Sequence, residues 1–329
     1  MAVSRRPLNT DGARISVALC THNGSAYVAD QIRSILAQTL PVHEIVLGDD
    51  ESSDDTVAIV RQLVDASDVD LIVREHRPGL GVRGNFADAI SATTGDIVAL
   101  SDQDDVWHAD RLATLVPHLT DRDLVHSDAR LVDSTLQPLG ETLLRSLEAT
   151  EWELDSLTSG EALPVLLRRN LVTGATVVMR GDFARAALPV PDGWLHDEWL
   201  AMLAAIDGGV KLVPEALTDY RQHDSNEVGA RRMSLVDKWK LLREQGSGAH
   251  RRKALRATTL AQAAFDRDLG DEETRTLLVA KARHERTRLG LPTWYPARVP
   301  AIARGLVQGR YGSFSRGSLE AVRDLLERR

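Results

Sequence analysis

Cysteine is almost absent from this sequence, and long apolar runs are absent altogether. The single cysteine, Cys20, leaves the 329-residue chain without an internal disulfide, which is typical of a reducing compartment. No uncharged apolar run reaches the roughly 18 residues that a membrane-spanning helix needs. The N-terminal residues MAVSRRPLNTDGAR carry arginines but no apolar stretch, unlike a signal peptide. These absences predict a cytoplasmic chain that does not span a membrane by itself.

Lysine is also scarce in most of the chain, and charge is divided unevenly. Residues 1–229 contain one lysine, Lys211, and hold 18 basic against 37 acidic residues. Residues 230–329 hold 22 basic against 11 acidic residues, so the net charge of −8 combines −19 with +11. An acidic body suits cation binding, and an arginine-rich end suits an anionic surface, such as the inner face of a membrane. The alternative is that the arginines only solvate helices.

The remaining composition, with 43% hydrophobic and 27% charged residues, is that of an ordinary globular protein. From residue 15, short β-rich runs alternate with helical periodicity. This alternation predicts an α/β fold with a mostly parallel sheet and helices on both faces. The first strands are expected at 15–19, 44–48, 70–74 and 96–100, and the helices at 25–39, at 57–64 after a cap at Ser53 or Asp54, and at 85–92 after a glycine-rich loop at 79–84.

Beyond residue 107 the alternation is less regular. Further strands are expected at 123–133, 173–179, 210–214 and 217–221, and helices at 108–119, at 141–170 with Pro164 interrupting, and at 199–206. The region from residue 231 has the pattern of helices separated by Gly246, Gly248, Gly270 and Pro292.

Polar side chains collect where three of the expected strands end. Thr21 and Asn23 follow the first strand, Asp50 the second, and Asp102 and Asp104 the fourth. In an open parallel sheet these strand ends share one edge, where ligands bind. Two carboxylates two residues apart can share one Mg²⁺ or Mn²⁺ ion, which would bring a diphosphate as its partner. The chain offers no Cys/His spacing for zinc.

Each acidic stretch also has a simpler interpretation. SDQDD, residues 101–105, has the composition of a turn that caps a helix, and so does DDESSDDT, residues 49–56. A lone DxD pattern carries little weight. The order of several motifs is more specific than any one of them.

Taken together, CTHNG, LGDDESSDDT, TTGDIVALSDQDDVW and HDEWL resemble the inverting glycosyltransferases of family 2. SDQDDVW and YRQHDSN are most similar to the rhamnosyltransferase-like members, and the resemblance covers about residues 13–226. It implies a GT-A fold, with a Rossmann-like nucleotide half at about 13–106 and an acceptor half at about 107–229. Together these halves form a domain at 13–229, and a basic helical region at 230–329 follows it.

The resemblance also implies roles for individual residues. Thr21 and Asn23 lie where the first strand of the family meets the nucleotide, and Asp50 lies where an acid contacts the base. Asp102 and Asp104 match the DxD motif, Asp104 as the more direct metal ligand. The further positions implied are Asp197 as the base that activates the acceptor, His223 as a ligand of the metal or diphosphate, and Arg83 and Asn85 as neighbours of the nucleotide.

The implied reaction is transfer of one sugar from a nucleotide diphosphate sugar, dTDP-rhamnose or a UDP-sugar, to a hydroxyl group. The acceptor would be a glycan or lipid-linked glycan of cell-surface polysaccharide synthesis, and nucleic acid would not be a partner. The arginine-tryptophan motif of processive synthases is absent, which favours single transfers.

Other interpretations remain open from the sequence. A non-catalytic nucleotide-sugar binder would carry the same motifs, and a metal-dependent nucleotidyltransferase would need a basic glycine-rich loop that CTHNGSAY does not provide. A receiver domain would need a later lysine, and only Lys211 precedes the basic region. Asp197 could be a helix N-cap and His223 a loop histidine.

Overall fold

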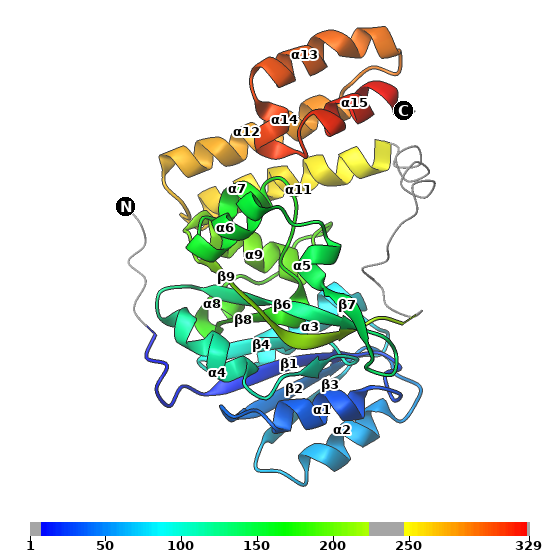
Figure 1. Cartoon of the computed structure of the whole chain (residues 1–329), viewed down its shortest axis with the longest axis vertical. Helices are drawn as coiled ribbons and strands as arrows, with labels where there is room; N and C mark the ends of the chain where they lie inside the picture. The colour runs from blue at the N-terminus through cyan, green and yellow to red at the C-terminus, as the bar shows by residue number, and fades with distance from the viewer. Residues whose placement is uncertain (1–7, 224–246, 328–329) are drawn as a thin grey trace.

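The computed structural model of the chain describes residues 8–223 and 247–327. Its centre is a nine-stranded mixed sheet in the order β3-β2-β1-β4-β8-β6-β9-β5, with β7 paired to β6 (Figure 1). The strands are β1 (Ile15–Thr21), β2 (Glu44–Asp49), β3 (Asp70–Glu75), β4 (Ile97–Ser101), β5 (Val106–Trp107), β6 (Leu124–Val132), β7 (Pro138–Thr142), β8 (Val177–Arg180) and β9 (Val210–Arg221). The expected α/β class is confirmed.

The first four strands run parallel and form the part of the sheet that was expected to bind the nucleotide, which we continue to call the nucleotide half. The part expected to bind the acceptor keeps the name acceptor half. β1, β2 and β4 are buried along their whole length, because helices cover both faces of the sheet. The helices α1 (Val28–Leu36) and α2 (Thr56–Val64) pack with one face, and α3 (Gly81–Ala92) packs with the other. Since the parallel strands all point the same way, the segments after β1, β2 and β4 lie at one edge, which we call the rim.

The acceptor half adds an antiparallel element, because β8 pairs antiparallel with both β4 and β6. β6 and β9 then run parallel, and β9 carries the short β5 along its outer side. The helices and turns of this half are α4 (Arg111–Leu115), η1 (Val116–Thr120), α5 (Leu143–Ser146), α6 (Glu151–Ser159), α7 (Ala162–Leu166), η2 (Gly174–Thr176), α8 (Gly181–Ala186) and α9 (His196–Ile206).

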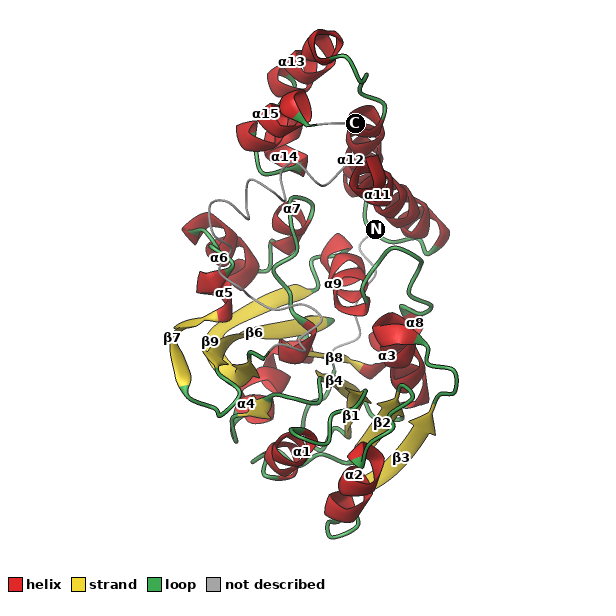
Figure 2. Cartoon of the chain, turned by 90° about the vertical axis from the view of Figure 1, so that its right-hand side faces the viewer, coloured by secondary structure: helices red, strands yellow, loops and turns green. Residues whose placement is uncertain are grey.

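The last part of the chain is helical and packs beyond α9 (Figures 1 and 2). Its elements are α11 (Ser247–Asp266), α12 (Glu272–Leu289), η3 (Tyr295–Arg298), α13 (Val299–Val307), α14 (Arg310–Phe314) and α15 (Ser318–Leu326). Leu260 and Ala264 of α11 and Leu278 of α12 belong to the same buried apolar cluster as α9. The C-terminal helices therefore share a core with the sheet domain.

Several sequence-based boundaries differ from the structure. The expected loop at 79–84 is mostly helix, since α3 begins at Gly81, and the two strands expected at 210–221 are one strand, β9, whose register shifts against β6. Residues 138–142 form β7, and Pro164 lies within α7 instead of interrupting a long helix. Gly248 lies inside α11. The expected boundary at 229/230 and Gly246 fall outside the described residues.

Within residues 8–223 and 247–327, no helix combines the length and the apolar character needed to cross a membrane.

Candidate active site at the rim of the sheet

The amide of Gln103 joins the segments that follow β1 and β4. Its Oε1 accepts from the His22 backbone N–H at 2.8 Å, and its Nε2 donates to the His22 carbonyl at 3.1 Å. A Cβ atom on Gly24 would lie 2.1 Å from this Oε1 atom, so only glycine leaves room for the contact. The sequence reasoning missed Gln103, although it lies between the two aspartates of the motif.

The two aspartates at the end of β2 have different environments. Asp49 is buried and accepts hydrogen bonds from the Thr21 hydroxyl at 2.6 Å and the Ser52 N–H at 3.0 Å. Asp50 is partly exposed at the rim, where its carboxylate accepts from the backbone N–H of Gly81 at 2.9 Å. The side chains of Thr21 and Asp49 therefore hold the rim together, and Asp50 both reaches it and binds the start of α3.

Asn23 connects the segments after β1 and β2. It has a left-handed backbone with φ of 47°, a conformation that asparagine tolerates better than most residues. Its Oδ1 accepts from the Ser53 N–H at 2.9 Å, and its own N–H donates to Ser52 Oγ at 2.8 Å. The residue is exposed, so its remaining surface faces the space above the rim.

Asp104 and His223 meet although they lie far apart in the sequence. The β5–β9 pairing places the end of β9 beside the acidic cluster. His223 Nε2 lies 2.8 Å from Asp104 Oδ2, and the Tyr27 ring stacks on the imidazole with 4.7 Å between centroids. Arg221 Nε donates to the Asp104 carbonyl at 2.7 Å. The structure therefore brings together Asp104 and His223, two of the three residues that the sequence proposed as metal ligands.

Asp105, next to the motif, is a buried acid. Burial raises its pKa well above the ordinary range, and the charges of Asp104 and Asp102 raise it further. Its Oδ1 accepts from the Arg221 N–H at 3.1 Å. Burial also lowers the pKa of Arg111 to about 9, although Asp105 opposes this shift. This side of the cluster belongs to the core.

The buried phenol of Tyr220 is influenced by the charges of both the acidic cluster and Asp197. Burial raises the pKa of its phenol, and the carboxylates of Asp105, Asp102, Asp104 and Asp197 raise it further. Carboxylates from two distant segments thus influence the same phenol, and no pattern in the sequence predicted a role for Tyr220.

Asp197 lies in the first turn of α9, whose N-cap residue is Leu195. The Asp197 carboxylate accepts from the backbone N–H of Gly174 at 3.1 Å and of Glu198 at 2.7 Å. Burial raises its pKa, so the group holds a proton more strongly than an ordinary aspartate does. The N-cap interpretation is wrong, and the environment is one that suits a general base.

The neighbours of Asp197 on α9 fix the helix in place. His196 stacks on Phe86 of α3 at 3.8 Å between centroids, and burial lowers its pKa to about 3, so the imidazole is neutral. Glu198 forms an ion pair of 2.6 Å with Arg256 of α11, whose guanidinium lies 4.2 Å over Trp194. The C-terminal helices therefore hold the helix that carries Asp197.

Two expected nucleotide neighbours have partners away from the rim's acids. Asn85 is buried on α3 and donates to the Gly48 carbonyl of β2 at 2.9 Å, and its approach to the nucleotide stays a prediction. Arg83 donates to the Val190 carbonyl at 2.8 Å and pairs with Asp192 at 2.8 Å, both in the acceptor half.

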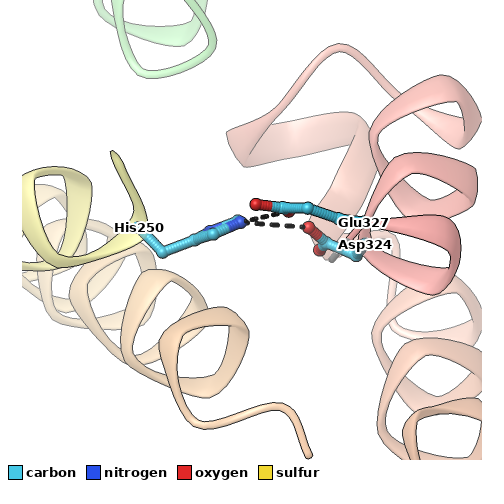
Figure 3. A group of neighbouring side chains, drawn as sticks. All are labelled: His250, Asp324 and Glu327. Atoms are coloured by element: carbon cyan, nitrogen blue, oxygen red, sulfur yellow. Dashed lines mark hydrogen bonds and ion pairs between the residues drawn. The ribbon is translucent and has the colours of Figure 1, made fainter. Parts of the chain in front are cut away.

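A second group of possible metal ligands lies in the C-terminal helices (Figure 3). His250, Asp324 and Glu327 place ligand atoms within 4.8 Å of one another, all buried. However, Asp324 Oδ2 already accepts from Arg288 Nε at 2.7 Å and from the Tyr311 hydroxyl at 2.7 Å. A cation at this group would face the Arg288 guanidinium, so we interpret it as an ion-pair network.

The donor set of Asp104 and His223 fits a divalent ion better. Neighbouring ligand atoms around an octahedral ion lie about 3 Å apart, and the Oδ2 and Nε2 atoms are separated by 2.8 Å. Asp102 is partly exposed on the same segment.

Comparison with known proteins agrees with this geometry. Residues 16–153 match the model of glycosyl transferase family 2. An uncharacterized glycosyltransferase of Nostoc sp. is 35% identical over 112 residues, which are 34% of each chain. The dTDP-rhamnosyl transferase RfbG of Shigella flexneri is 25% identical over 68% of this chain and 78% of its own.

Solved structures share the fold over nearly the whole chain. Staphylococcus aureus TarS 1–349 in complex with UDP-GlcNAc has a TM-score of 0.55 and 16% identity, covering 94% of this chain and 89% of its own. The mannosyltransferase PcManGT of Pyrobaculum calidifontis, in complex with GDP-Man and Mn²⁺, has a TM-score of 0.51 and 19% identity over 97% of this chain and 78% of its own. The sheet domain has the GT-A fold of nucleotide-sugar transferases. The match to glycosyltransferase family 2 covers residues 16–153, which is less than half of the chain.

Proposed function

We propose that this protein is an inverting, metal-dependent transferase that moves one sugar from a nucleotide diphosphate sugar to a hydroxyl acceptor. The observation that carries the proposal is the contact of Asp104 Oδ2 with His223 Nε2 at 2.8 Å, on the segment that also carries the partly exposed Asp102. Two carboxylates and an imidazole at the end of a parallel strand suit a site that receives a divalent cation and the diphosphate bound to it. The GT-A fold supplies the matching nucleotide half.

Each group at the rim has a role in this proposal. Asp104 and His223, with Asp102, would hold Mn²⁺ or Mg²⁺, which neutralises the diphosphate that leaves. Asn23 and Asp50 would bind the nucleotide, and Thr21 supports them through Asp49. Asp197 accepts the proton of the acceptor hydroxyl, and its raised pKa makes it a stronger base than an exposed aspartate. Arg83, which also binds Val190 and Asp192, would lie near the nucleotide together with Asn85.

The identity of the donor, the identity of the acceptor and the cellular location of the enzyme are also proposals. RfbG, by its name, transfers a dTDP-rhamnosyl group, whereas the TarS and PcManGT structures hold UDP-GlcNAc and GDP-Man. We place the transferase domain at 13–229 and assign the acceptor to cell-surface glycan or lipid-linked glycan. The basic region at 230–329 would bring a cytoplasmic enzyme to the anionic inner face of the membrane.

The test is a panel of nucleotide sugars assayed for release of nucleotide diphosphate, with Mn²⁺, with Mg²⁺ and with EDTA. We expect one donor to be used and EDTA to abolish its use. Asp197→Asn should lower transfer by about 10² to 10⁴-fold while the donor Kd stays unchanged. Asp155→Asn, an exposed acid on α6, is the matched control and should retain wild-type turnover.

Two results would contradict the proposal. Nucleotide diphosphate release that is insensitive to EDTA would remove the metal role of Asp104 and His223. Donor binding without any turnover would favour a non-catalytic binder, and release of inorganic diphosphate from a nucleoside triphosphate would favour a nucleotidyltransferase.

A further inference from the structure

A cavity of about 390 Å³ lies between the acceptor half and the C-terminal helices. Its wall is formed by residues 166–170, by α9, by α11 and α12, and by residues 314–323. α9 packs against both α7 and α11, and Figures 1 and 2 show it between them and the sheet. Eight lining side chains are basic and three are acidic, so the wall carries an excess of positive charge.

The acids of the wall are shared among several cations. Lys253, Arg288 and Arg323 all lie near Glu320, with nitrogen-to-oxygen distances of 3.8, 2.6 and 3.4 Å. Burial lowers the pKa of Lys253, as expected of an ammonium group whose charge is incompletely balanced. An anion in the cavity would relieve this excess.

Two further cations have no acid of their own. Arg168 donates to the Ser315 carbonyl at 3.3 Å and lies 4.9 Å over the Trp152 ring. Arg316 is exposed at the cavity wall. Neither arginine forms an ion pair with any acid in the part of the chain that the structure describes. Their guanidinium groups are therefore available to an anionic ligand.

A buried donor on the same wall is also without an acceptor. Trp194 lines the cavity and is 6% exposed, and its indole N–H has no hydrogen-bond partner among the described residues. Buried indole N–H groups usually find an acceptor. A phosphate oxygen in the cavity would provide one, and this observation is independent of the charge excess.

The cavity adjoins the proposed base. Glu198, one of its wall residues, directly follows Asp197 on α9. Asn170, another wall residue, lies on the segment that leads to Gly174, whose N–H binds the Asp197 carboxylate. A ligand anchored in the cavity could therefore extend toward Asp197.

We propose that this cavity binds the phosphate or diphosphate group of the acceptor and thereby presents the acceptor hydroxyl to Asp197. The inference rests on the proposed function and adds the chemical class of the acceptor. Arginine forks match phosphate geometry, and a volume of 390 Å³ lies in the usual range of small-molecule sites. The donor's own diphosphate belongs at the rim, so the two anions have separate sites.

The experiment measures the Kd of farnesyl diphosphate by calorimetry with EDTA present, so that the probe cannot bind at the rim through a metal. The double variant Arg168→Gln/Arg316→Gln should weaken binding roughly tenfold or more, because two charged donors are lost. The matched control is Arg251→Gln/Arg304→Gln, which removes two exposed arginines outside the cavity and should leave the Kd unchanged. In transfer assays the cavity variant should raise the KM of a diphosphate-linked acceptor and leave the KM of the donor unchanged.

Equal Kd values for the two double variants, or no binding by the wild-type chain, would overturn the inference. Inorganic pyrophosphate tests whether the cavity binds a free anion or the diphosphate of an acceptor. If pyrophosphate binds as tightly as farnesyl diphosphate and the cavity variant leaves the acceptor KM unchanged, the cavity binds a free anion and the acceptor role is overturned. Donor hydrolysis needs no acceptor. A chain that hydrolyses its donor but fails the binding test therefore loses only this inference, and the proposed function stands.

Discussion

The rim and the C-terminal helices use charge in opposite ways. At the rim, like charges gather over an apolar core: Asp102, Asp104 and Asp105 follow β4 within four residues, and the charges of Asp104 and Asp102 add to the raised pKa of the buried Asp105. In the C-terminal helices, opposite charges are buried together, and Arg288 is fully buried with Asp324 and Glu285. The first arrangement costs stability and suits ligand binding, whereas the second holds the fold.

The sizes of the two cores explain the difference. The apolar cluster under α1 and α2 contains 22 buried residues, but the cluster of the last helices contains four, so ion pairs must fix their packing. Arg298, also fully buried, donates to the carbonyls of Asp324 at 3.0 Å and Glu327 at 2.7 Å, which closes the end of α15. Loss of charge should therefore affect stability in one region and function in the other.

The largest expected effect is that of Arg288→Met on stability. The change leaves the buried Asp324 and Glu285 and the partly buried Glu320 without their shared cation, and such a loss costs about 3–5 kcal/mol. Urea denaturation followed by circular dichroism measures the free energy of unfolding. Arg286→Met, an exposed arginine on the same helix, should stay within about 0.5 kcal/mol of the wild type. Equal losses in both variants would mean that the network does not hold the helices.

Next is Asp104→Asn at the rim, where function should fall and stability should not. We expect transfer to drop at least about 100-fold, because the metal loses a charged ligand. The melting temperature should stay or rise, since one of several crowded carboxylates becomes neutral. Calorimetry and the nucleotide-release assay measure the two quantities. Asp68→Asn, an exposed acid in the nucleotide half, should change neither, and a destabilised Asp104→Asn would contradict the comparison.

Low pH should also affect the stability of the two regions differently. Burial alone would raise the pKa of Glu320, but the charges of Lys253 and Arg288 lower it to about 2. Its ionised form therefore stabilises the folded state fully at pH values above its ordinary pKa of 4.5. This contribution is lost as the pH falls from 4.5 toward 2. Asp105 and Asp197 have raised pKa values, so as the pH falls the folded state takes up these protons before the unfolded chain does. Their protonation therefore favours the folded state at low pH. Hydrogen exchange at pH 7 and pH 3.5 should show α15 losing protection before β1 and β4. The reverse order would contradict the comparison.

The same raised pKa predicts the pH dependence of turnover. Only the ionised Asp197 accepts a proton, so kcat should fall as the pH drops below its raised pKa, while an ordinary aspartate would remain active to about pH 4. Measuring kcat from pH 4 to 8 at a saturating donor concentration tests this fall in rate at low pH. A rate that stays constant down to pH 4 would remove Asp197 from the role of base.

The smallest expected effect is that of Arg256→Gln. Arg256 connects the C-terminal helices to the start of α9. Loss of the 2.6 Å ion pair with Glu198 frees the start of α9, and a partly buried pair of this kind is worth about 1 kcal/mol. We expect the acceptor KM to rise severalfold and the donor KM to remain constant. Arg252→Gln, an exposed neighbour on α11, is the control. A change in the donor KM would show that Arg256 acts on the rim instead.

The strand ends could be predicted from the sequence because their signals are local. Runs such as ISVAL and DIVAL identify buried strands, and the polar residues that follow them must then share an edge. The start of α9 was placed too late, because Leu195 gives no capping signal. The start of α3 was also placed too late, since the glycines at 79–84 suggested a loop where the helix had already begun.

The contacts that complete the site could not be predicted, because they join distant segments. Asp104 meets His223 only through the β5–β9 pairing, and Glu198 meets Arg256 only after the C-terminal helices have packed on α9. A single sequence contains no periodicity that reports such pairs.

The bridge from Glu198 to Arg256 limits how far the chain can be treated as two modules. A chimera that keeps residues 8–223 and takes unrelated helices in place of 247–327 would lose the guanidinium that positions the start of α9. The nucleotide half would keep its own scaffold, because the rim contacts of Asn23, Asp50 and Gln103 are made within residues 8–223. Donor preference could then be re-engineered by changes around the rim alone, whereas a new acceptor preference would require the sheet domain and the last helices to be changed together.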